Sequence, residues 1–178
     1  GISRGLRGKK TASGTQMGKA FQYGILYAYR AVTKPVEGTI LSVARGIAKG
    51  TYEVIRQEAD FSKVLESAIG HGNDALAKTP EQLKILKDAN VVDAGGQGLI
   101  FFLIGCLNGL TGKVSEVNLE IKPVISRLEA KGESFSIEYP YCTEFIISPC
   151  KLAAKEIRQK LGTWGESMIV AEGDNLIK

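Results

Sequence analysis

A glycine-rich stretch directly before an apolar run constrains this sequence more than any other feature. Residues 91–98 read Val-Val-Asp-Ala-Gly-Gly-Gln-Gly, and the mostly apolar run from Leu99 to Leu107 follows. A glycine turn that leads into a helix brings backbone N–H groups and the positive end of the helix dipole to one point, which suits an anion or a phosphate group. The same pattern fits an ordinary turn before a buried helix, so both interpretations stay open on the pattern alone.

Composition and periodicity predict a mainly α-helical, well-packed first part. The 178 residues suit one domain, or one domain with part of another, and 44% hydrophobic with 24% charged residues indicate a packed core. Asp60 is the expected N-cap of a helix, and Thr79 with Gln82 is the expected capping box of the next. The hydrophobic period predicts helices over residues 15–33, 38–57, 61–77, 80–89 and 97–110.

The pattern of the chain changes after residue 113. Residues 114–132 are mixed and charged and contain Pro123, so we expect a linker between a helical domain (1–113) and a second unit (133–178). A strand, strand, helix, strand order predicts a small α+β piece for the second unit. Its expected strands cover residues 134–139, 143–147 and 167–171, and its expected helix covers 151–161.

Three motifs carry a resemblance to a known family. Lys-Pro-Val-Glu-Gly-Thr-Ile-Leu-Ser-Val-Ala-Arg at 34–45 and Val-Val-Asp-Ala-Gly-Gly-Gln-Gly-Leu at 91–99 resemble the ATP-binding domain of the dihydroxyacetone kinase family. Tyr-Cys-Thr-Glu-Phe at 141–145 resembles the start of the middle domain in the bacterial branch that acts as the A component of fatty acid kinase. The motifs follow the family's order and spacing, and together they cover most of the chain.

The resemblance implies part of an antiparallel α-helical barrel, followed by the start of an α+β middle domain. Members of the family hold magnesium ions with an aspartate cluster, and they carry a Gly-rich loop upstream of the region seen here. Neither pattern occurs in this sequence. We therefore expect a truncated piece of a longer enzyme, inactive as a kinase by itself.

The resemblance also assigns nucleotide contacts to two segments. Gly38 and Thr39 match the segment that lies over the nucleotide, and Thr39 either contacts a phosphate or caps the following helix; the two roles are compatible. Ala94 stands where other kinases of the family have the proline of Asp-Pro-Gly. The late nucleotide-contacting loop of the family is matched by Asp93, Ala94, Gly95 and Gly96.

ATP and Mg²⁺ are the cofactors that the resemblance implies, and Zn²⁺ is a further candidate. The cysteine that corresponds to Cys142 lies near a later His-x-His pair in the related enzymes, and a cysteine with two histidines suits zinc. This sequence contains a single histidine, His71. A small buried residue at a strand edge is the alternative role for Cys142.

The implied function is an ATP-dependent kinase that phosphorylates the carboxylate of a fatty acid presented by a fatty-acid-binding protein of the DegV type. The alternatives are a dihydroxyacetone (glycerone) kinase and a non-catalytic helical module for dimerisation or regulation. Missing neighbour helices would bare apolar surface, so we expect a homodimer. Three cysteines without framework spacing, and no apolar run of membrane-spanning length, predict a cytoplasmic protein. The basic N-terminus is expected to be solvated rather than bound to nucleic acid.

Overall fold

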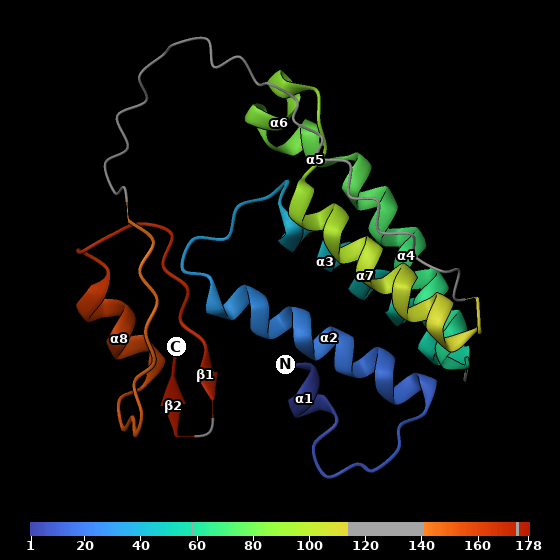
Figure 1. The fold of residues 1–178 in the computed structure, drawn as a ribbon, viewed down its shortest axis with the longest axis horizontal. Helices are drawn as coiled ribbons and strands as arrows, with labels where there is room; N and C mark the ends of the chain where they lie inside the picture. The colour runs from blue at the N-terminus through green and yellow to red at the C-terminus, as the bar shows by residue number, and fades with distance from the viewer. Residues whose placement is uncertain (58, 114–140, 174) are drawn as a thin grey trace.

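The first part of the chain folds into a bundle of four long helices. The computed structural model describes residues 1–113 and 141–178, apart from 58 and 174. The four helices run alternately back and forth (Figure 1), which confirms the mainly α-helical fold class. They are α2 (Gly14–Ala31), α3 (Ile40–Val54), α4 (Phe61–Ala77) and α7 (Ala94–Leu110). Shorter elements join them: α1 (Ile2–Gly5), a 3₁₀ turn (Ile55–Gln57), α5 (Thr79–Gln82) and α6 (Lys84–Ala89).

The core of the bundle lies between α3, α4 and α7. Its buried apolar side chains are Val43, Ile47, Leu65, Ala68, Leu76, Ile100 and Leu103. Helices α3 and α4 approach closely because α3 carries glycine at the contact. A Cβ added at Gly46 would lie only 2.6 Å from the carbonyl oxygen of His71 on α4. None of the helices in the described part of the chain combines the length and apolarity that a bilayer span needs.

The helix starts follow the sequence in part. Asp60 caps α4 as predicted, because its Oδ1 accepts a hydrogen bond from the Lys63 N–H at 2.9 Å. The predicted capping box at Thr79 is wrong, since Thr79 is already inside α5 and its hydroxyl bonds elsewhere. The predicted helix over 80–89 is divided at Leu83, whose backbone is extended.

The C-terminal part is a small α+β piece, as predicted, with shorter strands than expected. Helix α8 (Ala154–Leu161) precedes β1 (Glu172–Gly173) and β2 (Leu176–Ile177), which pair antiparallel. Its small core contains Ala154, Ile157, Val170 and Ile177.

Two of the predicted strands in this part are wrong. Within 143–147 only Ile147 forms a bridge, to Ile177. Within 167–171 the only bridge joins Ile169 to Val32, although the Val170 N–H also donates to Ala31 and Ala171 exchanges backbone hydrogen bonds with Lys178. The side chains of 143–146 are exposed, so no second layer among the described residues covers them to stabilise a ladder. The predicted strand at 134–139 and the linker at 114–132 lie outside the described residues, and the domain division stays a prediction.

Candidate functional site

The two segments that the sequence singles out lie next to each other at one end of the bundle. A Cβ added at Gly95 would lie 3.6 Å from the Cβ of Ile40, and one added at Gly96 would lie 3.2 Å from the Cβ of Val43. Ile40 is the first residue of α3, and Ala94 is the first residue of α7. The N-termini of α3 and α7 are therefore neighbours, and the positive ends of two helix dipoles share one region.

Asp93 starts α7 with its side chain. Its Oδ2 accepts a hydrogen bond from the Gly96 N–H at 2.7 Å, which is the N-cap arrangement. Residues 94–96 are therefore not a separate loop, as the glycine pattern suggests, but the first turn of the helix. Gly96 is buried against Val43, so glycine here allows the two helices to approach.

The first two residues of α7 are exposed and carry backbone N–H groups without a partner inside the helix. The first N–H groups of any α-helix have no partner inside the helix. Ala94 and Gly95 are exposed. The N–H of the third residue, Gly96, is already bonded to the Asp93 carboxylate. An incoming anion therefore finds donors at Ala94 and Gly95 beside the negative charge of Asp93.

Thr39 is the N-cap of α3. Its hydroxyl donates to the carbonyl oxygen of Val36 at 2.7 Å and accepts from the Leu41 N–H at 3.4 Å. The capping role of Thr39 thus holds in the structure, and its predicted contact with a phosphate stays a prediction.

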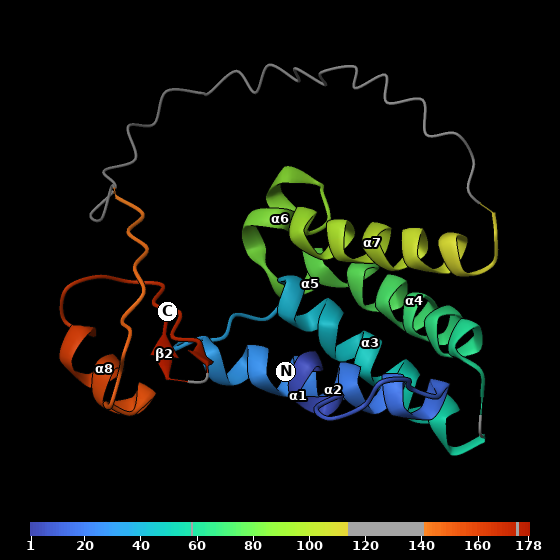
Figure 2. The ribbon, with the colours of Figure 1, turned by 60° about the horizontal axis from the view of Figure 1, so that its bottom comes forward.

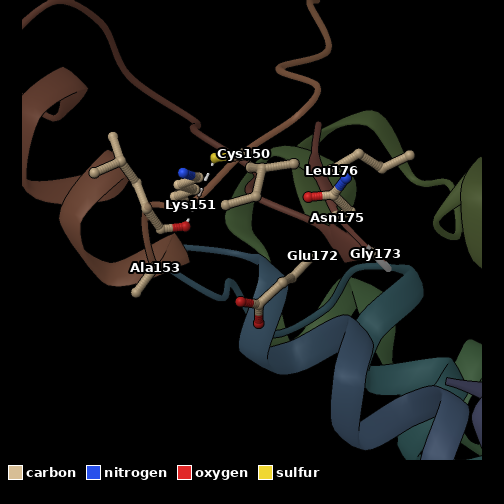
Figure 3. Close-up of a pocket in the computed structure, with 9 residues that line it drawn as sticks. Cys150, Lys151, Ala153, Glu172, Gly173, Asn175 and Leu176 are labelled. Atoms are coloured by element: carbon tan, nitrogen blue, oxygen red, sulfur yellow. Dashed lines mark hydrogen bonds between the residues drawn. The ribbon is translucent and has the colours of Figure 1, made fainter.

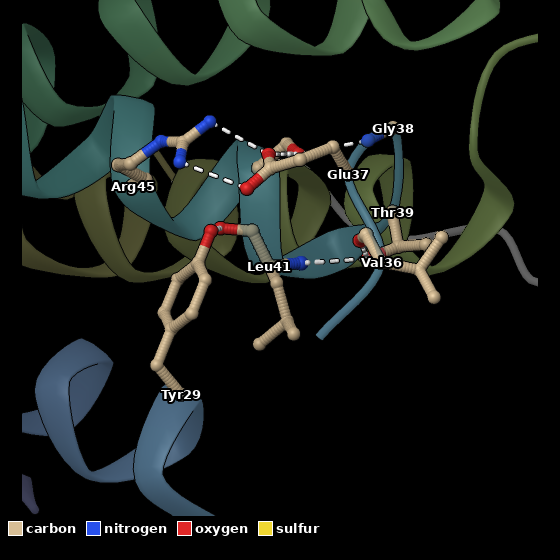
Figure 4. A network of polar contacts seen from close by, with 8 residues as sticks. Tyr29, Val36, Glu37, Gly38, Thr39, Leu41 and Arg45 are labelled. Atoms are coloured by element: carbon tan, nitrogen blue, oxygen red, sulfur yellow. Dashed lines mark hydrogen bonds and ion pairs between the residues drawn. The ribbon is translucent and has the colours of Figure 1, made fainter. Parts of the chain in front are cut away.

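A polar network holds the turn that precedes α3 (Figure 4). The Gly38 N–H donates to Ser42 Oγ at 2.8 Å, and the Ser42 hydroxyl donates to Glu37 Oε2 at 2.5 Å. Arg45 donates two hydrogen bonds to the same carboxylate, from Nη1 to Oε1 at 2.9 Å and from Nη2 to Oε2 at 2.6 Å. The hydrogen bond from Ser42 lowers the pKa of Glu37, and Arg45 adds to that lowering.

Gly38 and Tyr29 flank this network. Gly38 has a φ of +82°, and a Cβ added there would lie 2.7 Å from the Cβ of Leu83. The Tyr29 hydroxyl donates to the carbonyl oxygen of Leu41 at 3.0 Å, and burial raises the pKa of Tyr29. Position 38 therefore requires glycine, both because of its positive φ and because Leu83 leaves no room for a Cβ.

No role was predicted for Glu37, Ser42 or Arg45, although all three lie in the quoted 34–45 motif. The sequence spacing of Ser42 and Arg45 from the helix start at Thr39 indicates this network. Ser42 follows the cap Thr39 by three residues, the position from which a polar side chain reaches back to the residues before a helix. Arg45 lies one turn further along the same face.

Cys142 does not lie among metal ligands in the described part of the chain. No group of three or more His, Cys, Asp or Glu side chains there could hold a metal ion. We therefore assign no chemical step to zinc or magnesium. The alternative role of Cys142 as a buried residue is wrong, because its side chain is exposed. His71, the single histidine, pairs with Glu53 at 3.1 Å.

A cavity of about 360 Å³ lies apart from this site, in the C-terminal piece (Figure 3). It opens between the residues before α8 and the β1–β2 hairpin. Lys151, Glu172 and Asn175 give it a polar lining of mixed charge. None of the predicted nucleotide-contacting residues lines this cavity.

Comparison with known families finds a match for each of the two parts of the chain. Residues 1–108 match the family model of the DAK2 domain, and residues 138–178 match that of the FakA-like middle domain of fatty acid kinase. Because the first match covers more than half of the chain, the chain belongs to the DAK2 domain family. The second match relates it to the A component of fatty acid kinase.

Relatives from three staphylococci resemble the whole chain. Uncharacterized proteins of Staphylococcus epidermidis, Staphylococcus haemolyticus and Staphylococcus aureus are 32%, 34% and 31% identical to it. Each alignment covers 100% of this chain and 34% of the relative. The chain thus spans about a third of the length of these curated relatives.

Proposed function

We propose that this chain supplies part of the nucleotide site of an ATP-dependent kinase of the dihydroxyacetone kinase superfamily. The single observation that carries the proposal is the pairing of two helix N-termini, α3 at Ile40 and α7 at Ala94. Membership of the DAK2 domain family supports a phosphate as the anion that such a pair would receive.

The described residues offer donors that suit a phosphate group. Exposed N–H groups at the start of α7 and the dipoles of α3 and α7 favour a negative charge. Each dipole is worth only about 0.3–1 kcal/mol for an exposed anion. Two such terms sum to about 0.6–2 kcal/mol, whereas a dissociation constant of 1 mM needs about 4.1 kcal/mol. We therefore expect a dissociation constant for ADP that is weaker than about 1 mM.

The proposed acceptor is the carboxylate of a fatty acid presented by a separate fatty-acid-binding protein of the DegV type. The match of residues 138–178 to the FakA-like middle domain of fatty acid kinase supports this choice. Transfer of the terminal phosphoryl group of ATP to that carboxylate gives an acyl phosphate and ADP. Residues 38–40 and 93–96 would bind and orient the phosphates, and the protein would act in the cytoplasm.

Product analysis separates the acceptors. The full-length product of the gene that encodes this chain is incubated with ATP, Mg²⁺ and a fatty-acid-loaded binding protein, and hydroxylamine traps any acyl phosphate as a hydroxamate. Hydroxamate formation that depends on ATP supports a fatty acid kinase. Glycerone phosphate from added dihydroxyacetone, without hydroxamate, would replace our proposal with the dihydroxyacetone kinase alternative.

Calorimetry with ADP tests the nucleotide site in the 178-residue chain. Asp93→Ala removes the cap of α7, whereas Asp93→Asn keeps an oxygen that accepts from Gly96 and removes the charge. Loss of one cap costs about 1 kcal/mol of helix stability, so we expect Asp93→Ala to loosen the first turn of α7. ADP affinity should therefore be lower in Asp93→Ala than in Asp93→Asn, which keeps the cap and loses only the charge beside the phosphate. Asp60→Ala, which removes the cap of α4, is the matched control.

Exposed apolar side chains on α7 support a second role, as a dimerising helical module. Phe101 and Phe102 are 62% and 65% exposed, and Leu110 at the end of the same helix is 52% exposed. Large exposed apolar patches mark surfaces that associate. The proposed homodimer would bury these aromatic rings, and it is compatible with nucleotide binding at the N-terminal end of α7.

A further inference from the structure

We propose that the C-terminal piece of the chain positions the nucleotide-facing turn, with Arg158 as a positioning residue. The connection between α2 and α3, residues 33–39, is named here the strap. It carries Gly38 and Thr39 at its far end. The inference rests on the proposed function for its effect on nucleotide, and on contacts of the described residues for its mechanical part.

The near end of the strap is paired with the C-terminal piece. The backbone N–H and the hydroxyl of Thr33 both donate to the carbonyl oxygen of Met168, at 3.2 Å and 2.8 Å. The Val170 N–H donates to the carbonyl oxygen of Ala31 at 3.0 Å, and Val32 forms an antiparallel bridge with Ile169. The views in Figures 1 and 2 agree that this piece lies beside the end of α2.

Arg158 fastens the same junction from α8. Its Nη2 donates to the carbonyl oxygen of Arg30 at 2.8 Å and to that of Val170 at 3.0 Å. Carbonyl groups in the last turn of a helix lack partners inside the helix, so a cation there is favourable. The buried Nε of Arg158 has no hydrogen-bond acceptor among the described residues. The hydrogen bonds of Arg158 to Arg30 and Val170 both come from Nη2, and this atom joins the end of α2 to the segment before β1.

The far end of the strap is also held by hydrogen bonds. The Gly38 N–H bonds to Ser42, and Thr39 caps α3 through Val36 and Leu41. Pro35 stiffens the strap between its two anchors by fixing its own φ. A short, stiff connection has little slack, so a change at the Thr33 end is passed on to Gly38.

Coupling of this kind is reciprocal. If the C-terminal piece favours the strap geometry that binds nucleotide, then nucleotide must favour the docked C-terminal piece by the same factor. We expect a factor on the order of fivefold, at the low end of measured couplings. The C-terminal piece would thereby report to the rest of the protein whether the nucleotide site is filled.

Hydrogen exchange resolved by NMR tests the mechanical step without nucleotide. Arg158→Ala and Thr33→Val each break contacts at the near end of the strap, and Arg158→Lys keeps a cation there. Thr111→Val is the matched control, because the Thr111 hydroxyl also donates to a backbone carbonyl oxygen, that of Leu107, at the far end of α7. The readout is the exchange rate of the Gly38 amide, followed by ADP affinity in the same samples.

The inference predicts faster Gly38 exchange in Arg158→Ala and Thr33→Val, recovery in Arg158→Lys and no change in Thr111→Val. ADP affinity falls about fivefold in parallel, and ADP slows exchange of the Val170 amide in the parent chain. Unchanged Gly38 exchange overturns the inference, whatever ADP does. If Gly38 responds but the parent chain binds no ADP, positioning of the strap stands and the proposed nucleotide site fails.

Discussion

The hydroxyl of Thr79 accepts a hydrogen bond from the backbone N–H of Asp93 at 3.1 Å. The same hydroxyl donates to the carbonyl oxygen of Leu76 at 2.7 Å, and Thr79 is completely buried. One side chain thus joins the end of α4 to the residue that caps α7. The orientation of the α7 N-terminus, and with it the proposed phosphate site, depends on this hydroxyl.

Replacement of Thr79 should therefore destabilise the bundle. Thr79→Val keeps the shape but leaves the Asp93 N–H and the Leu76 carbonyl without this partner, at a cost of about 1–3 kcal/mol in the free energy of unfolding. Thr79→Ser keeps the hydroxyl and should recover most of that loss. Urea unfolding followed by circular dichroism measures both variants. Equal stability of the valine and serine variants would contradict a role for the hydroxyl.

Gly38 should tolerate no larger side chain. Gly38→Ala places a Cβ against Leu83 at a φ of +82°, so we expect a loss of about 1–2 kcal/mol or more in the free energy of unfolding. Gly105→Ala is the control, because a Cβ there would meet nothing within 4 Å on α7. That control should raise stability by about 0.5–1 kcal/mol, as expected for alanine in a helix interior. An unchanged free energy of unfolding in Gly38→Ala would mean that the turn can adjust to a Cβ, and it would contradict this prediction.

Acid should weaken the network around Glu37. The pKa of the Glu37 carboxyl lies below its ordinary value of 4.5, mainly because the Ser42 hydroxyl donates to it. The charged form is thus favoured by folding, so its contribution is complete above pH 4.5 and is lost as the pH falls through the lowered pKa.

Unfolding free energies of the parent chain and Glu37→Gln, measured from about pH 7 to about pH 3, check this sign. The difference between the two should be constant at neutral pH and should shrink below pH 4.5. Glu66→Gln, at an exposed position of α4, is the matched control. A difference that grows on acidification would show that the carboxylate is unfavourable in the folded state.

The exposed aromatic face of α7 should mediate self-association. We expect sedimentation of the parent chain to show a dimer that becomes monomeric in the double variant Phe101→Lys, Phe102→Lys. Trp164→Lys changes an aromatic residue that is 79% exposed in the C-terminal piece, and it should leave the dimer intact. A parent chain that stays monomeric at high concentration would contradict the proposed homodimer.

Local sequence signals predicted the regular helices well. Helix α4 covers Phe61–Ala77 in the structure, as its sequence pattern predicts, because Asp60 caps it and its apolar stripe is uninterrupted at the core face. The start of α7 was misplaced by three residues, since glycine is a poor helix former. Packing outweighs that propensity, because any side chain at position 96 would collide with Val43.

Contacts between residues far apart in the chain were beyond local reasoning. Thr79 and Asp93 are separated by a whole helix, and the Val32–Ile169 bridge joins opposite ends of the chain. The predicted strands at 143–147 and 167–171 failed for the same reason, because strand pairing depends on a partner that alternation within one segment does not reveal. The network of Glu37, Ser42 and Arg45 was local and was within reach of helix-cap reasoning.

Titration of the isotopically labelled chain with ADP, followed by amide chemical shifts, tests the central claim most directly. The account predicts that the largest shifts fall on two segments, residues 38–41 at the start of α3 and 93–96 at the start of α7. Both segments should give the same dissociation constant, since one phosphate group would contact both helix ends. Shifts that spare these segments, or that cluster around the C-terminal cavity at Lys151 and Asn175, would contradict it.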